Sequence, residues 1–205
     1  MLLERIVRVP NTTDAFRLEF ENGTKLRCYV ENVADFSLAS GMEIYPERFE
    51  ALTEAIAFSR TRRRAARLAA SRPISEGELK AKLVQKGESA ENAAAAAKRL
   101  VSAGAVDDAA CAESVVRRCA AKGYGPAEVK RRLAAAKIPR ELWDEAMEGL
   151  GDQTETIDRL LRARIRTGDK QELARAGEYL ARRGFSWDEV RSALRRYGEI
   201  SEDEE

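Results

Sequence analysis

Apolar and polar side chains alternate in two short runs near the start of the chain, with Asn22 and Gly23 between them. The apolar positions are Phe16, Leu18 and Phe20 in the first run and Leu26, Cys28 and Val30 in the second. A period of two is typical of a half-buried strand, and Asn-Gly favours a type I′ turn. The pattern predicts a β-hairpin within a β-rich N-terminal extension, residues 1–46. Because an isolated hairpin is marginally stable, we expect it to pair with residues 5–9 or 42–45, or to dock on helices.

After Pro46 the apolar positions change to helical spacing, which continues to about Gly198. Three stripes show this spacing most clearly: Ala112, Val115, Val116 and Cys119; Leu142, Trp143, Ala146, Met147 and Leu150; and Ile157, Leu160, Leu161 and Ile165. Any globular helix needs such a stripe to pack against its neighbours, so we interpret these residues as core. The fold is therefore predicted to be mainly α.

The helical part repeats at an interval of about 50 residues. Residues 78–100 align with residues 128–150 and then with residues 177–197. In this alignment Leu83, Leu133 and Leu180 coincide, and so do Gly87, Lys137 and Gly184. Each unit is too small to bury its apolar faces alone. We predict three tandem three-helix repeats, at residues 47–103, 104–151 and 152–198, that stack into an elongated, curved array.

The sequence also indicates where helices begin and end. Ser75 followed by Glu78 has the form of a capping box, and Asp107 or Asp108 can cap the first helix of the second repeat. Gly87 and Gly184 stand where a helix is expected to end, which suits the left-handed backbone of a helix C-terminus.

The composition excludes several kinds of site. The chain of 205 residues has no histidine and three cysteines. It therefore lacks Ser/His and Cys/His nucleophile pairs and zinc sites that contain histidine. No phosphate-binding glycine motif favours nucleotide binding. We expect a protein that is not an enzyme and uses no cofactor or metal. We also expect it to be cytoplasmic, because no apolar run approaches the length of a membrane span and the amino terminus is too charged for a signal peptide.

Basic residues gather in the helical part, although the formal net charge is only +1. Arg60, Arg63, Arg64 and Arg67 have the spacing of one side of a helix. Further basic positions recur through the repeats: Arg72, Lys80, Lys82, Lys130, Arg131, Arg132, Arg182, Arg183, Arg191 and Arg195. One hypothesis is a basic face that contacts phosphates or an acidic protein surface. The other is a solvated surface whose charges are neutralised by carboxylates from elsewhere in the fold.

The carboxyl end of the chain is acidic, in contrast to the basic helical part. Residues 199–205, EISEDEE, contain five acidic residues and no basic one. We predict a disordered acidic tail. The alternative is autoinhibition, in which the tail screens the basic face from a partner.

One stretch of the repeats resembles a known family. The segment ARLAASRPISEGELKAKLVQKG, residues 66–87, resembles the signature of the RecX regulators of the RecA recombinase. The resemblance covers residues 50–198 and continues through Gly104, Val106, Asp107, Asp108 and Ala112, then Lys122, Gly123 and Gly125, and lastly Leu133 and Ile138. The N-terminal hairpin and the following SGMEIYPERFEAL are similar to an extension carried by longer members.

The resemblance implies a non-enzymatic regulator that binds in the groove of the RecA–DNA filament. It implies that the protein blocks filament extension and inhibits strand exchange, ATP hydrolysis and co-protease activity, in homologous recombination, DNA repair and the SOS response. The expected partners are the RecA filament and, weakly through phosphates, single- or double-stranded DNA. We expect a monomer with no membrane partner. The alternatives are a DNA-binding helical-repeat protein without sequence specificity that acts alone, and an adaptor for another protein.

Overall fold

The computed structural model describes the backbone of residues 1–203 and the side chains of residues 1–198. The chain divides into two compact units. The first consists of Met1–Ser71 and Leu79–Ala103, and the second of Arg72–Glu78 and the residues from Gly104 onward. The predicted repeat boundaries at residues 103 and 151 stay a prediction.

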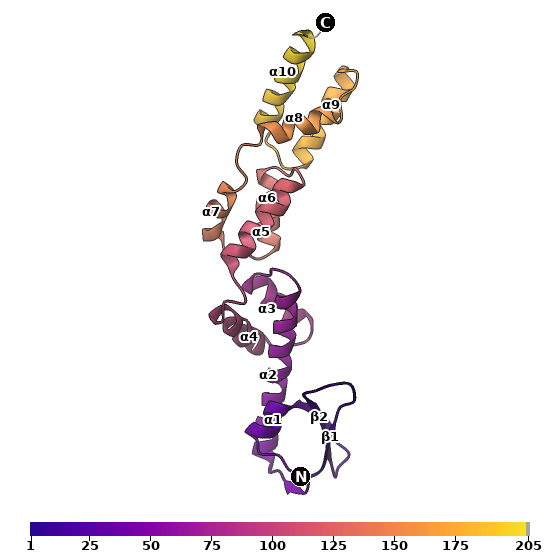
Figure 1. The fold of residues 1–205 in the computed structure, drawn as a ribbon, viewed down its shortest axis with the longest axis vertical. Helices are drawn as coiled ribbons and strands as arrows, with labels where there is room; N and C mark the ends of the chain where they lie inside the picture. The colour runs from indigo at the N-terminus through magenta and orange to yellow at the C-terminus, as the bar shows by residue number, and fades with distance from the viewer. Residues whose placement is uncertain (204–205) are drawn as a thin grey trace. The chain divides into compact units, whose positions relative to one another are not determined.

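The first unit begins with an antiparallel sheet in the order β3-β2-β1-β4, two strands of which, β1 and β2, are labelled in Figure 1. Its strands are β1 (Leu2–Arg8), β2 (Ala15–Phe20), β3 (Lys25–Tyr29) and β4 (Met42–Glu43). The predicted hairpin is confirmed as β2 and β3, and Leu18 lies opposite Leu26. Strand β1 pairs with both β2 and β4. The core of this sheet holds Leu3, Leu18, Phe20, Cys28 and Ile44.

The turn between β2 and β3 differs from the predicted type I′ turn. Gly23 has a φ of +80°, but Asn22 is not among the residues with positive φ, which a type I′ turn requires at both central positions. The amide of Gly23 donates to the carbonyl of Phe20 over 2.9 Å, and the amide of Phe20 donates to the carbonyl of Thr24 over 3.0 Å. Asn22 accepts a hydrogen bond from the Thr24 amide through its side chain, at 3.0 Å. Asn22 therefore stabilises a longer loop by its side chain.

A short helix that the sequence pattern did not predict, α1 (Val30–Asp35), follows β3. Val30, expected at the end of a strand, begins this helix and is 51% exposed. The buried Asn32 accepts from the Tyr29 amide at 3.1 Å and donates to the Ser59 hydroxyl at 3.0 Å. Ser59 belongs to α2 (Pro46–Ser71). A buried amide is stable here because both its oxygen and its nitrogen have partners, and it joins the sheet to α2.

Helices α3 (Glu76–Gln85) and α4 (Ala90–Ser102) follow α2, and α4 packs against α2. Leu79 and Leu83 are fully buried on α3. Helix α4 buries small side chains, those of Ala93, Ala96 and Ala97. Small side chains allow α4 to lie close to α2, and this leaves a shallow apolar surface between the two helices.

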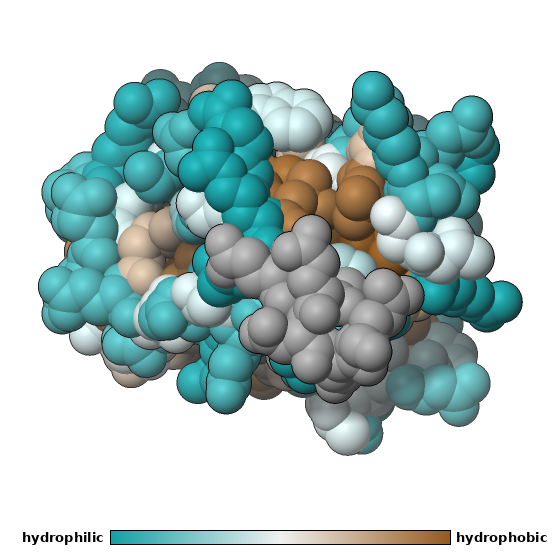
Figure 2. All heavy atoms as spheres, turned by 90° about the horizontal axis from the view of Figure 1, so that it is seen from above, coloured by the Kyte–Doolittle hydropathy of each residue, from teal (hydrophilic) through white to brown (hydrophobic). Residues whose placement is uncertain are grey.

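The second unit contains the remaining helices. They are α5 (Asp108–Ala121), α6 (Pro126–Ala135), the 3-10 helix η1 (Arg140–Leu142), α7 (Trp143–Glu148), α8 (Thr154–Arg162), α9 (Lys170–Arg182) and α10 (Trp187–Asp203). The predicted apolar stripes form two cores, one around Val116, Val129 and Leu133 and one around Leu161 and Leu180. Figure 2 looks down on the end of this unit that carries α9 and α10, where hydrophilic side chains surround the apolar atoms still visible between them.

Helix ends support the predicted alignment of the repeats. Gly87, Lys137 and Gly184 have φ angles of +83°, +53° and +93°. In each case the next amide donates back to the aligned leucine: Glu88 to Leu83 over 3.1 Å, Ile138 to Leu133 over 3.2 Å, and Phe185 to Leu180 over 3.2 Å. The left-handed residues expected at Gly87 and Gly184 are confirmed. Lys137 takes the same conformation although its Cβ makes that conformation less favourable than it is for glycine.

The paired acidic residues cap two different helices. Asp107 accepts a hydrogen bond from the Ala110 amide at 3.0 Å and caps α5. Asp108 accepts from the Glu76 amide at 2.7 Å, and Ser75 accepts from the Glu78 amide at 3.0 Å, so both cap the start of α3. The sequence predicted that one of the two aspartates caps the first helix of the second repeat. In the structure Asp107 caps that helix, α5, and Asp108 caps α3.

Neighbouring repeats meet in the same way twice within the second unit. At the start of α3 the Ser75 hydroxyl donates to the carbonyl of Ala136, and a Cβ on Gly77 would lie 2.9 Å from the Cβ of Lys137. At the start of α6 the Gly125 amide donates to the Arg183 carbonyl over 2.9 Å. A Cβ on Gly184 would lie 2.4 Å from the Glu128 nitrogen. Gly77 in the first contact, and Gly125 and Gly184 in the second, therefore let the two backbones approach.

The carboxyl end differs from the prediction. Helix α10 continues to Asp203, where the sequence predicted a disordered tail from residue 199. Residues 204–205 and the acidic side chains of the tail lie outside the part that is described, and so does the predicted screening of a basic face. Within residues 1–203, no helix is long and apolar enough to cross a membrane.

Candidate binding surfaces

The arginines of α2 surround a buried carboxylate. The side chain of Glu88, in the turn between α3 and α4, is 1% exposed. It accepts hydrogen bonds from the Thr61 hydroxyl at 2.7 Å, from Arg60 at 3.1 Å and from Arg64. Burial raises the pKa of Glu88, but the bonds from Thr61 and Arg60 outweigh it and the pKa lies below the ordinary value. Arg60 and Arg64 therefore hold the turn against α2.

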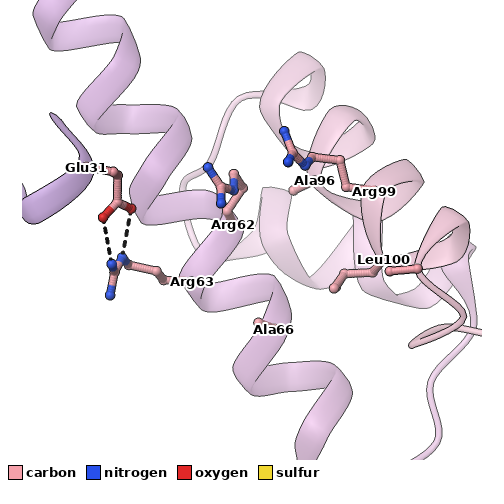
Figure 3. A pocket seen from close by; sticks show the side chains of 8 residues that line it. Glu31, Arg62, Arg63, Ala66, Ala96, Arg99 and Leu100 are labelled. Carbon is pink, nitrogen blue, oxygen red and sulfur yellow. Dashed lines mark hydrogen bonds and ion pairs between the residues drawn. The ribbon is translucent and has the colours of Figure 1, made fainter. Parts of the chain in front are cut away.

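Arg63 connects α2 to the N-terminal extension. Its guanidinium donates to Glu31 over 2.8 Å, as Figure 3 shows, and also to Asp14. The ring of Tyr29 lies 4.2 Å from the same guanidinium. Burial raises the pKa of Glu31, but the hydrogen bond from Arg63 is part of what lowers it overall. Three predicted members of the basic face, Arg60, Arg63 and Arg64, are thus paired inside the first unit.

The other basic positions around the first repeat differ in their surroundings. Arg67 is exposed and has no ion pair among the side chains of residues 1–198. Lys80 and Lys82 are half-buried on α3 and interact with other groups. Of the predicted α2 arginines, Arg67 therefore differs from Arg60, Arg63 and Arg64 in having no carboxylate partner among the described residues.

A basic hollow lies in the second unit on the surface of α5 and α6. Its volume is about 320 Å³, and four cations line it: Arg72, Arg118, Lys122 and Arg132. Glu78, which pairs with Arg72, is the single carboxylate in the lining. The remaining walls come from Tyr124 and from the apolar parts of Val115, Cys119, Ala135 and Ala136. The excess of cations makes this hollow suitable for an anionic group.

Two helices position these cations. Arg118 and Lys122 stand one turn apart at the end of α5, where the helix dipole favours positive charge. Arg132 lies on α6 over the ring of Tyr124, with 4.3 Å between its guanidinium carbon and the ring centre, and donates to Glu128 over 2.8 Å. The sequence analysis included Arg72 and Arg132 but missed Arg118 and Lys122. Their spacing of four residues near a helix end was a signal that could have found them.

The predicted basic group of the second repeat is only partly free. Glu128 accepts from Arg131 over 2.7 Å and from Arg132 over 2.8 Å. The hydrogen bond from Arg131 lowers the pKa of Glu128 most, against the opposing effect of burial. Lys130 is exposed on α6 and has no ion pair among the described side chains. Arg131 therefore belongs to a local cluster, whereas Lys130 points its charge to solvent.

In the third repeat, Arg183 joins two repeats. It donates to the carbonyls of Lys122 and of Gly123, the latter over 3.1 Å, and lies 5.0 Å from the Tyr124 ring. Arg182 is 3.5 Å from Glu178, and Arg191 pairs with Asp188. Arg195 is exposed. The predicted stripe therefore combines a structural arginine with several exposed ones.

The cysteines offer no reactive thiolate. Cys28, Cys111 and Cys119 are free and buried. Burial raises the pKa of all three thiols, that of Cys28 to about 11. Within the described residues, no group of three or more His, Cys, Asp or Glu side chains could hold a metal ion.

Comparisons with known proteins identify the family of this chain. Residues 107–147, which include most of the basic hollow, match the family model described as RecX, second three-helix domain. The chain is 40% identical over 136 residues to the regulatory protein RecX of Stenotrophomonas maltophilia, a match that covers 64% of this chain and 83% of that protein. It is 38% identical to the regulatory protein RecX of Xanthomonas campestris pv. campestris, with 64% and 84% covered.

Two solved structures share the fold. The crystal structure of a regulatory protein RecX matches with a TM-score of 0.69 at 18% identity and covers 95% of this chain and 98% of that one. The crystal structure of RecX from Lactobacillus salivarius matches with a TM-score of 0.60 at 18% identity, with 69% and 97% covered. The identity of 38–40% to curated relatives, of which the matches cover 83–84%, shows that this chain belongs to the RecX family.

Proposed function

We propose that this protein regulates a RecA recombinase by binding to its DNA filament, blocking filament extension and so inhibiting ATP hydrolysis, strand exchange and co-protease activity. The regulatory role is supported by the RecX relatives, which are named as regulatory proteins. In this proposal the protein acts in the cytoplasm as a monomer, without a cofactor, in recombination, repair and the SOS response.

One observation carries the proposal: most of the basic hollow lies within the part of the chain that the RecX domain model matches. Arg118, Lys122 and Arg132 fall in residues 107–147 and line the same hollow. A recombinase filament presents phosphates of bound DNA and acidic side chains of protein, and clustered cations attract both. A surface of this kind can bind the filament without reading a base sequence.

The proposal keeps part of the basic face predicted from sequence and adds to it. Arg72 and Arg132 line the hollow, and Arg118 and Lys122 join them. Lys130, Arg182, Arg191 and Arg195 are exposed positions that can extend the contact. Arg60, Arg63, Arg64, Arg131 and Arg183 contribute mainly by holding the fold, because they are engaged with groups of this chain.

The test is DNA-dependent ATP hydrolysis by a purified RecA recombinase with increasing amounts of the protein. We expect inhibition at amounts below one protein per recombinase subunit, because blocking extension affects many subunits at once. A variant with Arg118→Glu and Lys122→Glu is the matched comparison, since both residues are exposed and their loss should leave the fold intact. A saturating amount of wild-type protein without any effect, at low and at moderate salt, would overturn the proposal.

The same purified protein can be used to test the alternative function, in which the protein binds DNA without a recombinase. Among the described residues, Tyr124 is the one aromatic side chain in the lining of the hollow, so the lining forms no platform on which successive bases could stack. We therefore expect weak, salt-sensitive binding to DNA alone, measured by fluorescence anisotropy of a labelled oligonucleotide. Tight and sequence-specific binding without recombinase would favour the alternative.

A further inference from the structure

A second hollow lies in the first unit between α2 and α4. It has a volume of about 350 Å³, and an adjoining hollow shares Arg99 and Ala103 with it. Figure 3 shows Arg62 on α2 and Arg99 on α4 beside this space, with Leu100 further along α4 and Arg63 directed to Glu31. None of these features belongs to the basic hollow of the second unit.

The cations beside the groove differ in their partners. The Arg63 guanidinium is held by Glu31 and Asp14. Neither Arg62 nor Arg99 has an ion pair among the side chains of residues 1–198. Arg62 lies 5.9 Å from the ring centre of Phe58, a weak contact that leaves its charge available. Glu31 also lines the hollow, and the charge of Arg62 helps to lower its pKa, but the Glu31 carboxylate is bonded to Arg63. Arg62 and Arg99, from facing helices, therefore leave an excess of positive charge beside the groove.

The floor of the groove is apolar. It is formed by Ala66 of α2 and by Ala96, Leu100 and Ala103 from α4 and its end. Phe58 and Ala95 continue this surface in the adjoining hollow, where Lys98 adds a third cation. The alanines carry too little side chain to fill the space between the helices. Ala96 is already buried, but a partner can place an aliphatic or aromatic side chain there and remove carbons of Ala66, Leu100 and Ala103 from water.

We propose that the groove between α2 and α4 binds an acidic peptide segment of a partner protein, with one aliphatic or aromatic side chain on the alanine floor and carboxylates on Arg62 and Arg99. Charge complementarity and an apolar floor are the two requirements of an amphipathic segment that docks between helices. The proposal goes beyond filament regulation, because it gives the first repeat a binding site of its own.

A peptide fits this groove better than a nucleic acid does. The floor side chains of Ala66, Ala96 and Leu100 have no hydrogen-bonding group. Sugar hydroxyls and base edges would lose water there without gaining a partner, and this loss is unfavourable. An aliphatic side chain gains from the same surface. In the basic hollow of the second unit, by contrast, four cations stand close together, which suits phosphates.

The test uses a short fluorescein-labelled synthetic peptide in which glutamates flank a central leucine, with anisotropy as the readout. We expect the full-length protein to bind it, and Arg62→Glu combined with Arg99→Glu to weaken binding at least about tenfold. Ala66→Leu should also weaken binding, because a larger side chain fills the floor without a change in charge. The matched control is Arg27→Glu, an exposed arginine on β3, which should bind normally.

The peptide itself supplies the other controls. Replacement of its leucine by serine should weaken binding as much as Ala66→Leu does, since both remove the apolar contact. No binding of the peptide, or equal binding by wild type and the Arg62/Arg99 variant, would overturn the proposal. Loss of oligonucleotide binding rather than peptide binding in that variant would overturn it in favour of a nucleic-acid site. Inhibition of recombinase ATP hydrolysis, measured in parallel, tests the proposed filament regulation separately.

Discussion

The arginines of α2 and the cations of the second repeat carry the same charge in different surroundings. On α2, Arg60 and Arg64 share the buried Glu88, and Arg63 pairs with Glu31 and Asp14. In the hollow of the second unit, Arg118 and Lys122 are exposed and have no ion pair among the described side chains. These arginines of α2 are thus paired within the fold, whereas Arg118 and Lys122 carry charges without an ion pair among the described side chains.

The difference shows that the position of the carboxylates determines whether the cations of a basic cluster are paired within the fold. In the sequence, helix α3 lies between Arg60 and its partner Glu88, and Asp14, a partner of Arg63, precedes strand β2. No local sequence pattern around α2 contains these acids. Exposed pairs contribute little to stability, whereas a buried carboxylate that loses its partners is costly.

The largest effect is expected when Glu88 is replaced. Glu88→Ala removes the acceptor of Thr61, Arg60 and Arg64, and we expect the first unit to lose about 2 to 3 kcal/mol of unfolding free energy. Native-state hydrogen exchange at the amides of α2 and α4 measures this loss. It is preferable to tryptophan fluorescence, because Trp143 and Trp187 both lie in the second unit.

The matched control for Glu88 is Glu91→Ala, an exposed acidic residue in the first turn of α4. Its removal should change the exchange free energy by less than about 0.5 kcal/mol. Equal effects of the two substitutions would show that the buried carboxylate does not anchor the turn.

A smaller effect is expected for the arginine that holds the N-terminal extension. Arg63→Ala removes the pairs with Glu31 and Asp14 and should cost about 1 kcal/mol, discounted because these groups are partly exposed. The loss should appear as faster hydrogen exchange in β2, β3 and α1. Arg62→Ala is the control on the same helix, since Arg62 has no ion pair among the described side chains. Slower or unchanged exchange in β3 of the Arg63 variant would contradict this role.

Acidification should weaken the first unit further through Glu88. The pKa of Glu88 in the folded chain lies below the ordinary glutamate value of about 4.3. Above that pH both states are ionised and the pairing contributes in full. As the pH falls, the unfolded chain binds its proton first, so the contribution is lost progressively down through the folded pKa.

This pH effect can be isolated with Glu88→Gln. The variant should be less stable than wild type at neutral pH, and its stability should fall less steeply between about pH 5 and pH 3. Hydrogen exchange or urea unfolding of both proteins across that range gives the two curves. Parallel curves would mean that Glu88 does not contribute to the acid sensitivity.

The smallest effect is expected at Arg67. Arg67→Ala removes an exposed charge without an ion pair among the described side chains, so the unfolding free energy should change by less than about 0.5 kcal/mol. Urea unfolding measures it against wild type. If Arg67→Ala lowered the unfolding free energy as much as Arg63→Ala does, the ion pairs of Arg63 would not explain its contribution to stability.

Local sequence patterns predicted most elements of the fold. Alternation identified β2 and β3, and helical spacing identified the stripes that form the cores of the second unit. Left-handed helix ends were predicted at Gly87 and Gly184, and the structure adds the aligned Lys137, for which the sequence analysis made no such prediction. The predicted features depend on neighbours in sequence, so a single chain is sufficient to predict them.

The binding surfaces were harder to predict, because they depend on residues that meet only in the folded chain. The sequence grouped Arg60, Arg63, Arg64 and Arg67 by helical spacing but gave no sign of Glu88 or Asp14 as partners. Arg183 was predicted on a basic face, and it also bridges two repeats through the carbonyl of Gly123. Helix α1 was missed for a similar reason, since the buried bond between Asn32 and Ser59 supports it.

The most direct test of the account compares two double variants in recombinase ATP hydrolysis. Arg118→Ala with Lys122→Ala changes the hollow of the second unit, and Arg60→Ala with Arg67→Ala changes α2. Circular dichroism first establishes that both are folded. We predict that the first variant needs about tenfold more protein than wild type for half-maximal inhibition, and that the second stays within about twofold. Normal inhibition by the first variant and loss of inhibition by the second would contradict the account.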